Sequence, residues 1–130
     1  MAFFWIERIF CRAKAHQGWY RAAVSSARDA VLRYGANTTS FQVLEPGYTF
    51  FPYDDGVIAY VDTGLAWVAA GDPLTRPEVR VDAAISFCAA ARRARRVPCL
   101  FATEGAFVQA AQAAGFSSIL LGEQPVFDPS

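Results

Sequence analysis

The stretch from residue 56 to residue 76, GVIAYVDTGLAWVAAGDPLTR, constrains the fold more than any other. Two short apolar runs, 57–61 and 65–70, flank the turn residues Asp62-Thr63-Gly64. Short runs that are rich in β-branched and aromatic residues and bounded by turn residues favour strands over a helix. Gly71-Asp72-Pro73 ends the second run, because proline lacks the N–H that a strand ladder needs. The stretch therefore predicts a β-hairpin that leads into a helix.

The chain before this hairpin predicts a helix and then a β-meander. Apolar residues repeat at three- and four-residue spacing over 19–34, which is typical of a helix with one buried stripe. Gly35 follows as a stop signal. Asp54-Asp55-Gly56 suits the positive φ of a tight hairpin. The other expected elements are strands at 41–44 and 48–53 with a turn at 45–47 between them.

The chain after the hairpin predicts alternating helices and strands. Thr75 and Glu78 have the spacing of a helix capping box, and Pro77 lies in the first turn. This helix is expected to run to about Arg95 and to bury the stripe Val81, Ala84, Ile85, Cys88 and Ala91. The later elements are a strand at 97–102, a helix from Thr103-Glu104 to about Ala114 that Gly115 ends, and strands at 118–121 and 125–127.

The order of these elements indicates the fold class. An antiparallel meander followed by α/β crossovers gives an α/β (α+β) mixed sheet with helices on both faces. The length of 130 residues suits one domain, which we expect over 19–130, after an amphipathic lead-in at 1–18 that Gln17-Gly18 ends. Hydrophobic residues make up 54% of the chain, which argues against disorder and indicates a surface that is covered in the complete molecule.

The lead-in combines an aromatic face with basic residues. Such a segment, at residues 3–14, can lie on an anionic membrane surface, or it can pack on the domain or on a partner. No apolar run is long enough for a membrane span, and Glu7 and Arg8 interrupt the start too soon for a signal peptide. The three cysteines show no metal or redox spacing, so we expect free thiols in a reducing compartment.

Four arginines crowd the end of the helix after the hairpin, although the net charge of the chain is zero. Basic side chains complement the negative end of a helix, but four exceed what that role needs. Ordinary helix surface and a phosphate site, on transfer RNA or on a lipid head group, both stay open as interpretations. These residues are Arg92, Arg93, Arg95 and Arg96.

Several kinds of catalytic motif are absent from the sequence. His16 is the only histidine, and there is no Ser-His-Asp set, G-x-S-x-G, P-loop or zinc spacing. This excludes most standard hydrolases and metalloenzymes, and no metal site is expected. Asp72, Glu104 and Glu123 lie at predicted strand or helix edges. Each is a weak catalytic candidate, as a general base or as a group that binds an amine, because loop carboxylates more commonly cap helices or face solvent.

Short motifs in a particular order resemble a known family. They are Tyr34-Gly35, Gly71-Asp72-Pro73, Ala114-Gly115-Phe116 and Gly122-Glu123. Over roughly 19–128 the chain resembles the cytosolic domain of bacterial phosphatidylglycerol lysyltransferases, also called multiple peptide resistance factors. The resemblance implies a GNAT-like fold and the first half of a tandem of two such units. Members transfer an aminoacyl group, commonly lysyl, from charged transfer RNA to phosphatidylglycerol.

The resemblance also sets expectations for activity and partners. It implies an aminoacyltransferase unit that is inactive alone, with aminoacyl-transfer RNA as donor substrate and the arginines holding phosphate. The glycine-spaced pyrophosphate signature of ordinary GNAT enzymes is not visible, which argues against acetyl-coenzyme A, and no cofactor is expected. Implied partners are a second GNAT-like half or another copy, transfer RNA and anionic lipid head groups. The implied location is cytoplasmic, with peripheral contact to the inner membrane through 3–14.

Two other functions stay open at this point. The chain can be a non-catalytic binding or dimerisation module that pairs with another chain. It can also be a small stand-alone acyltransferase, which the missing pyrophosphate signature places last.

Overall fold

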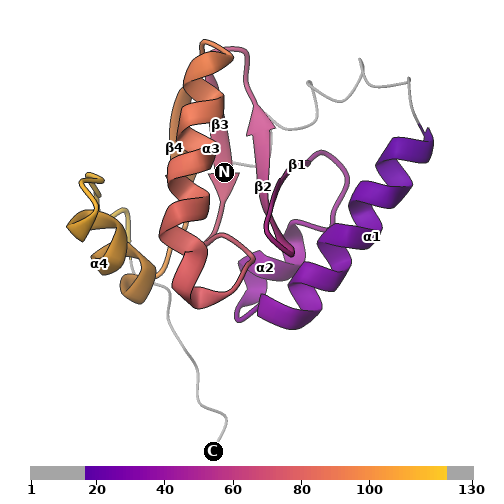
Figure 1. The fold of residues 1–130 in the computed structure, drawn as a ribbon, viewed down its shortest axis with the longest axis horizontal. Coiled ribbons are helices and arrows are strands. Elements are labelled where there is room, and N and C mark those ends of the chain that lie inside the picture. Colours follow the sequence, from indigo (N-terminus) through magenta and orange to yellow (C-terminus); the bar gives the residue numbers. More distant parts are fainter. Residues whose placement is uncertain (1–16, 123–130) are drawn as a thin grey trace, which may run out of the picture.

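The computed structural model describes residues 17–122, which form a four-stranded mixed sheet with helices on both faces (Figure 1). The strand order β1-β2-β3-β4 follows the chain, and the predicted fold class is confirmed. No helix in this range is long and apolar enough to cross a membrane. The elements are α1 (Gln17–Tyr34), α2 (Thr38–Gln42), β1 (Thr49–Tyr53), β2 (Gly56–Asp62), β3 (Ala66–Ala70), the 3₁₀ turn η3 (Pro77–Val79), α3 (Arg80–Arg93), β4 (Val97–Phe101) and α4 (Gly105–Ala113).

The predicted hairpin is the centre of the sheet. β2 and β3 pair antiparallel, with Val61 opposite Val68, and the chain leaves β3 at Gly71 with a φ of +74°. β1 also pairs antiparallel with β2, while β3 and β4 run parallel and α3 connects them. In the tight turn between β1 and β2, the residue with positive φ is Asp54 at +53°, and not Gly56. Gly56 is required there for a different reason, which is the close approach of the chain at Leu74.

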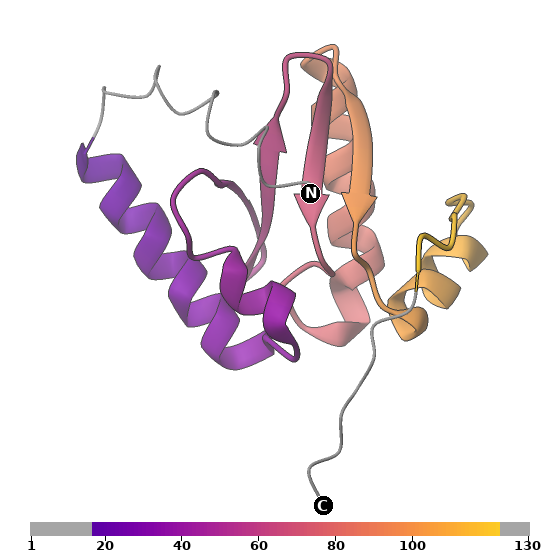
Figure 2. The same ribbon diagram turned by 180° about the vertical axis from the view of Figure 1, so that it is seen from behind.

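The sheet separates two apolar layers. Val57 and Ala59 of β2 pack in the layer under α1, and Ile58 and Tyr60 pack in the layer under α3. This alternation follows from the two-residue period of a strand. Figures 1 and 2 show α1 beside the β1–β2 half and α3 against the opposite face. Over residues 25–34 of α1, the buried residues are Ala27, Ala30 and Val31, which follow the expected three- and four-residue spacing.

The buried stripe of α3 is rotated from the predicted one. Ala84, Cys88 and Ala91 are buried as expected, but Ile85 is 46% exposed and Phe87 is fully buried. Rings from three strands of the sheet surround Phe87, so its burial removes far more apolar surface than burial of Ile85 would.

The predicted capping box of this helix is wrong. Thr75 is 1% exposed, and its Oγ1 has no hydrogen-bond partner in the described part of the chain. Arg76 precedes the helical turn with ψ of 135°, the extended conformation that a following proline favours. Pro77 therefore begins a 3₁₀ turn, and α3 starts only at Arg80 and ends at Arg93.

Three further local predictions differ from the structure. Residues 41–44 are not a strand, because Asn37 caps α2 by accepting a hydrogen bond from Ser40 N at 3.0 Å, and the helix with its following turn takes these residues. Residues 118–121 have no regular structure. Gln17 and Gly18, expected to end the lead-in, belong to α1. The lead-in at 1–16 and the predicted strand at 125–127 lie outside the described residues.

Candidate functional site

Two of the three candidate carboxylates meet at one edge of the sheet. Asp72 follows β3 and Glu104 follows β4, and the carboxyl ends of parallel strands share an edge where ligands of α/β proteins commonly bind. Gly71 N donates to Phe101 O at 2.7 Å, which holds the two loops together where they leave the strands. Glu123 lies outside the described residues.

Asp72 is half-buried and bonded to the neighbouring loop. Its Oδ1 accepts a hydrogen bond from Glu104 N at 2.9 Å. Burial raises the pKa of the Asp72 carboxyl, and the Glu104 charge adds to this. The hydrogen bond from Glu104 N and the Arg80 charge oppose the rise in pKa without cancelling it. The charged form of Asp72 is thus costly where it lies.

Asn37 joins a third loop to this pair. Its Nδ2 donates to Glu104 Oε1, while its Oδ1 caps α2. The three side chains therefore connect the loops α1–α2, β3–η3 and β4–α4, and we call them the Asn37–Asp72–Glu104 clamp. Sequence reasoning named the two carboxylates but missed Asn37. The signal that could have found it is the Asn-Thr-Thr-Ser order, which is typical of a helix N-terminus.

The raised pKa of Asp72 gives a testable pH dependence. The folded state holds the Asp72 proton to higher pH than the unfolded state, so this group lowers stability as pH rises through the range just above an ordinary aspartate pKa. Asp72→Asn keeps an acceptor for Glu104 N and removes that titration. We expect the variant to be as stable as wild type or slightly more stable at pH 7, and to lack the fall in stability that the Asp72 titration adds as pH rises.

Urea unfolding of both proteins between pH 4 and pH 7 measures this effect. Asp29→Asn, which removes an exposed carboxylate on α1, is the control for the change of aspartate to asparagine. A steeper loss of stability in Asp72→Asn as pH rises would contradict the assigned direction.

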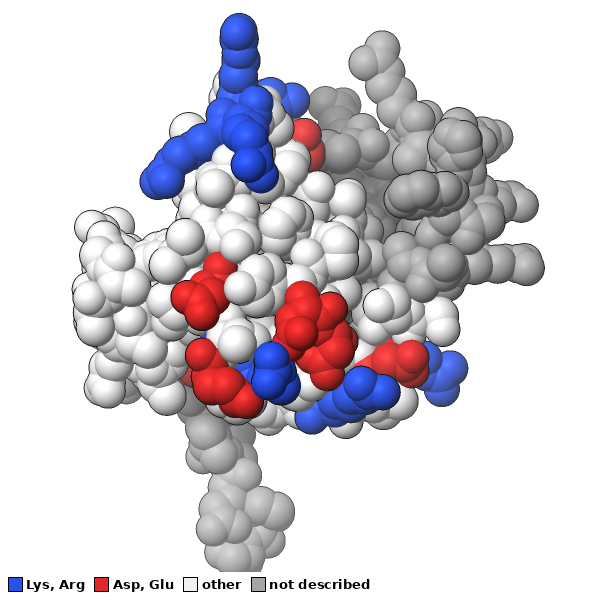
Figure 3. Space-filling model, in the orientation of Figure 1, with Lys and Arg blue, Asp and Glu red and all other residues white. Residues whose placement is uncertain are grey.

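The arginine cluster lies at the other end of α3 from the clamp. The 14 residues of α3 span about 21 Å at 1.5 Å per residue. Arg92, Arg93 and Arg95 are exposed there and form the projecting blue group in Figure 3. The carboxylates and the arginines that the sequence singled out thus occupy two places and do not form one site.

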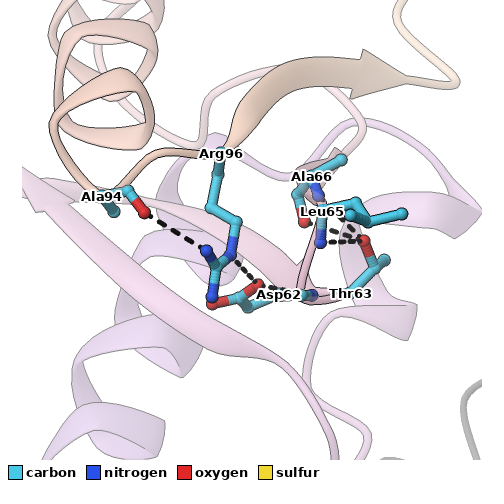
Figure 4. A network of polar contacts seen from close by, with 7 residues as sticks. Asp62, Thr63, Leu65, Ala66, Ala94 and Arg96 are labelled. Carbon is cyan, nitrogen blue, oxygen red and sulfur yellow. Dashed lines mark hydrogen bonds and ion pairs between the residues drawn. The ribbon is translucent and has the colours of Figure 1, made fainter.

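Arg96 differs from the other three arginines because it holds the β2–β3 turn. Its Nε lies 2.8 Å from Asp62 Oδ1, and the same oxygen accepts a hydrogen bond from Gly64 N at 2.8 Å (Figure 4). Burial alone would raise the pKa of Asp62, but the hydrogen bonds from Arg96 and Gly64 hold it below its ordinary value. Arg96 is therefore committed to a structural ion pair.

A second set of polar contacts fixes the β1–β2 turn. Tyr34 donates its hydroxyl to Asp55 Oδ2 at 2.5 Å, and Arg76 Nη2 lies 2.7 Å from Asp54 Oδ2. Tyr34-Gly35 was one of the motifs in the resemblance, and its place here is structural. Gly35 has no room for a side chain, because a Cβ would lie 2.4 Å from Val31 O.

Known proteins give one informative comparison. No family model matches the sequence, and no curated protein matches it. Among solved structures, the chain is similar to L-PGS, a lysyl-phosphatidylglycerol synthase, from Bacillus licheniformis, with a TM-score of 0.59 and 20% sequence identity. The match covers 70% of this chain and 29% of the L-PGS chain. At this identity the likeness concerns the fold, and the predicted mixed α/β fold is confirmed at that level.

Proposed function

We propose that this chain is a GNAT-like unit of an aminoacyltransferase that modifies phosphatidylglycerol or a similar lipid, with lysyl as the donor group. The observation that carries the proposal is the fold likeness to L-PGS. The order of short motifs that resembles the lysyltransferase family agrees with this proposal. The chain spans less than a third of the L-PGS chain, so the complete reaction is assigned to a larger assembly.

The reaction itself sets the demands on the site. A lipid hydroxyl oxygen attacks the ester carbonyl that joins the amino acid to the ribose of transfer RNA. A new ester forms, the ribose–acyl bond breaks, and the lipid hydroxyl proton ends on the ribose oxygen. The step therefore needs two oriented substrates, a route for this proton and donors for the developing oxyanion.

The clamp is better suited to orienting a substrate than to supplying groups that take part in the reaction. Asp72 Oδ1 and Glu104 Oε1 already accept hydrogen bonds that join the loops, and residues 17–122 contain no histidine. We therefore assign to this unit the role of holding one side of the site, and to a second unit the oxyanion donors and the proton route. On this assignment the unit is inactive alone.

Disruption of the gene in its source cells tests the proposal. We expect the loss of an aminoacylated phospholipid, measured by mass spectrometry of extracted lipids, and its return when the intact gene is supplied. Complementation with Asp72→Asn or with Glu104→Gln should restore the lipid in proportion to the amount of protein, because both carboxylates act structurally. An unchanged lipid profile after disruption of the gene would contradict the transferase proposal. If either variant protein accumulates to the normal amount but no aminoacylated lipid returns, the substituted carboxylate is catalytic.

A non-catalytic binding module is the second candidate. The observation in its favour is a set of large apolar side chains exposed on β4 and after α4, namely Val97, Phe101, Ile119, Leu120 and Leu121. This candidate predicts that gene disruption leaves the lipids intact and that the purified chain self-associates or copurifies with a partner in fixed stoichiometry.

A further inference from the structure

Among the described residues, three arginines near the end of α3 form no ion pair with a carboxylate. Arg33, Arg76 and Arg96 each form an ion pair with an aspartate. Within residues 17–122, no such pair is formed by the exposed set Arg92, Arg93 and Arg95. Figure 3 shows this group projecting together from one end of the molecule. Unpaired guanidinium groups that gather in this way fit a surface of phosphates.

Two aliphatic side chains are exposed at the same end. Leu65 in the β2–β3 turn is 82% exposed, and Val97 at the start of β4 is 65% exposed. They are neighbours, because Val97 N donates to Leu65 O at 3.0 Å. The end of the sheet thus combines unpaired arginines with exposed aliphatic groups.

The turn that carries Leu65 is held in place. Thr63 Oγ1 accepts from Ala66 N at 3.0 Å and donates to Ala66 O at 3.1 Å (Figure 4). The Arg96–Asp62 pair joins this turn to the loop that follows α3. The backbone that carries Leu65 is therefore held in place relative to the backbone that carries the arginines. Binding through this surface would cost little ordering of the backbone.

We propose that Leu65, Val97, Arg92, Arg93 and Arg95 form a docking surface for a bilayer that contains anionic phospholipid. The arginines lie at the level of the phosphates, and Leu65 enters the boundary between head groups and acyl chains. A nucleic acid would satisfy the arginines but would leave Leu65 exposed, since bases stack on aromatic side chains or guanidinium planes. The pairing of aliphatic and basic groups therefore favours the membrane.

The surface has a consequence for the orientation of the unit. The clamp and the arginines lie toward opposite ends of α3, whose 14 residues span about 21 Å, so docking at the arginine end holds the clamp away from the bilayer. In the proposed transferase, the lipid hydroxyl would then react on the second unit, and this unit would hold the enzyme at the membrane. Only this last step rests on the proposed function; the docking surface rests on its own residues.

Vesicle sedimentation of the purified chain tests the docking surface without any catalysis. The probes are vesicles of phosphatidylcholine alone and vesicles of phosphatidylcholine that contain about 30% phosphatidylglycerol, an anionic lipid. We expect binding to the anionic vesicles only, weakened as salt rises. Arg92→Gln, Arg93→Gln and Arg95→Gln together should weaken it about 100-fold, at about fivefold for each arginine. Leu65→Ala should weaken it about tenfold.

Matched controls lie on α1. Arg28→Gln and Leu32→Ala change the same residue types at exposed positions, and neither should alter vesicle binding. Near-wild-type binding by the triple variant would overturn the proposal. This is also the result expected if residues 3–14, and not the arginines, bind the vesicles. Binding of transfer RNA through these arginines, without binding to vesicles, would overturn it in favour of a nucleic acid. A Leu65-dependent dimer in light scattering, without vesicle binding, would overturn it in favour of a second copy.

Discussion

Phe87→Ala is expected to lower the free energy of unfolding by about 3–5 kcal/mol, the usual range for truncating a buried aromatic side chain. Phe87 is fully buried in the layer between α3 and the sheet. Its ring centroid lies 5.8 Å from that of Phe51, 5.4 Å from that of Tyr60 and 5.8 Å from that of Trp67. These partners come from β1, β2 and β3, so one truncation loosens the contact of α3 with three strands.

A control two residues away separates packing from helix propensity. Ile85→Ala lies on the same helix, but Ile85 is 46% exposed, so we expect a loss below about 1 kcal/mol. Urea unfolding followed by tryptophan fluorescence and by far-ultraviolet circular dichroism measures both variants. Equal losses for Phe87→Ala and Ile85→Ala would mean that α3 faces the sheet with the side that the sequence predicted.

Local signals explain which elements of the fold could be predicted. The β2–β3 hairpin was recognised because its turn chemistry lies within the turn itself, where Asp62 bonds Gly64 N and Thr63 bonds Ala66. α1 was recognised because its apolar residues repeat at helical spacing, and Ala27, Ala30 and Val31 face one layer. Residues 41–44 were wrongly predicted as a strand because the cap at Asn37 was not considered. In the structure that cap decides the outcome.

The errors along α3 have a tertiary cause. Periodicity alone allows the stripe to be centred on Ile85 or on Phe87, since both lie within one turn of Ala84 and Cys88. The aromatic partners of Phe87 come from three strands that are distant in sequence, and they decide between the two. The capping box failed for a similar reason, because packing buries Thr75 against Gly56, and its hydroxyl has no hydrogen-bond partner among the described residues.

The candidate site was predictable in its members but not in its geometry. Asp72 and Glu104 are 32 residues apart, and only the parallel pairing of β3 with β4 brings their loops together. The four arginines were correctly seen as a sequence cluster. Their division into one structural residue and three exposed ones depends on Asp62, which the β2–β3 turn presents to Arg96. Pairing between distant segments thus carries the information that local patterns lack.

Gly56→Ala should be the other strongly destabilising change, at about 3–5 kcal/mol. A Cβ at this position would lie 2.0 Å from Leu74 O and 2.7 Å from Thr75 Cβ, so the backbone of one segment must move. Val57 and Leu74 exchange two hydrogen bonds, at 3.0 and 2.9 Å, which the movement would lengthen. Overpacking costs about 1–3 kcal/mol, and each lost hydrogen bond adds about 1 kcal/mol.

Gly105→Ala is the matched control for this steric argument. Gly105 begins α4, a Cβ there would meet nothing within 4 Å, and its φ is not in the left-handed region. Alanine should therefore leave stability unchanged or raise it by up to about 1 kcal/mol, because glycine loses more backbone entropy on folding. Chemical unfolding of the two variants under the same conditions makes the comparison. Similar stabilities of the two variants would mean that the segment at Leu74 does not lie against β2. The path of the chain from Asp72 to the start of α3 would then differ from the one described above.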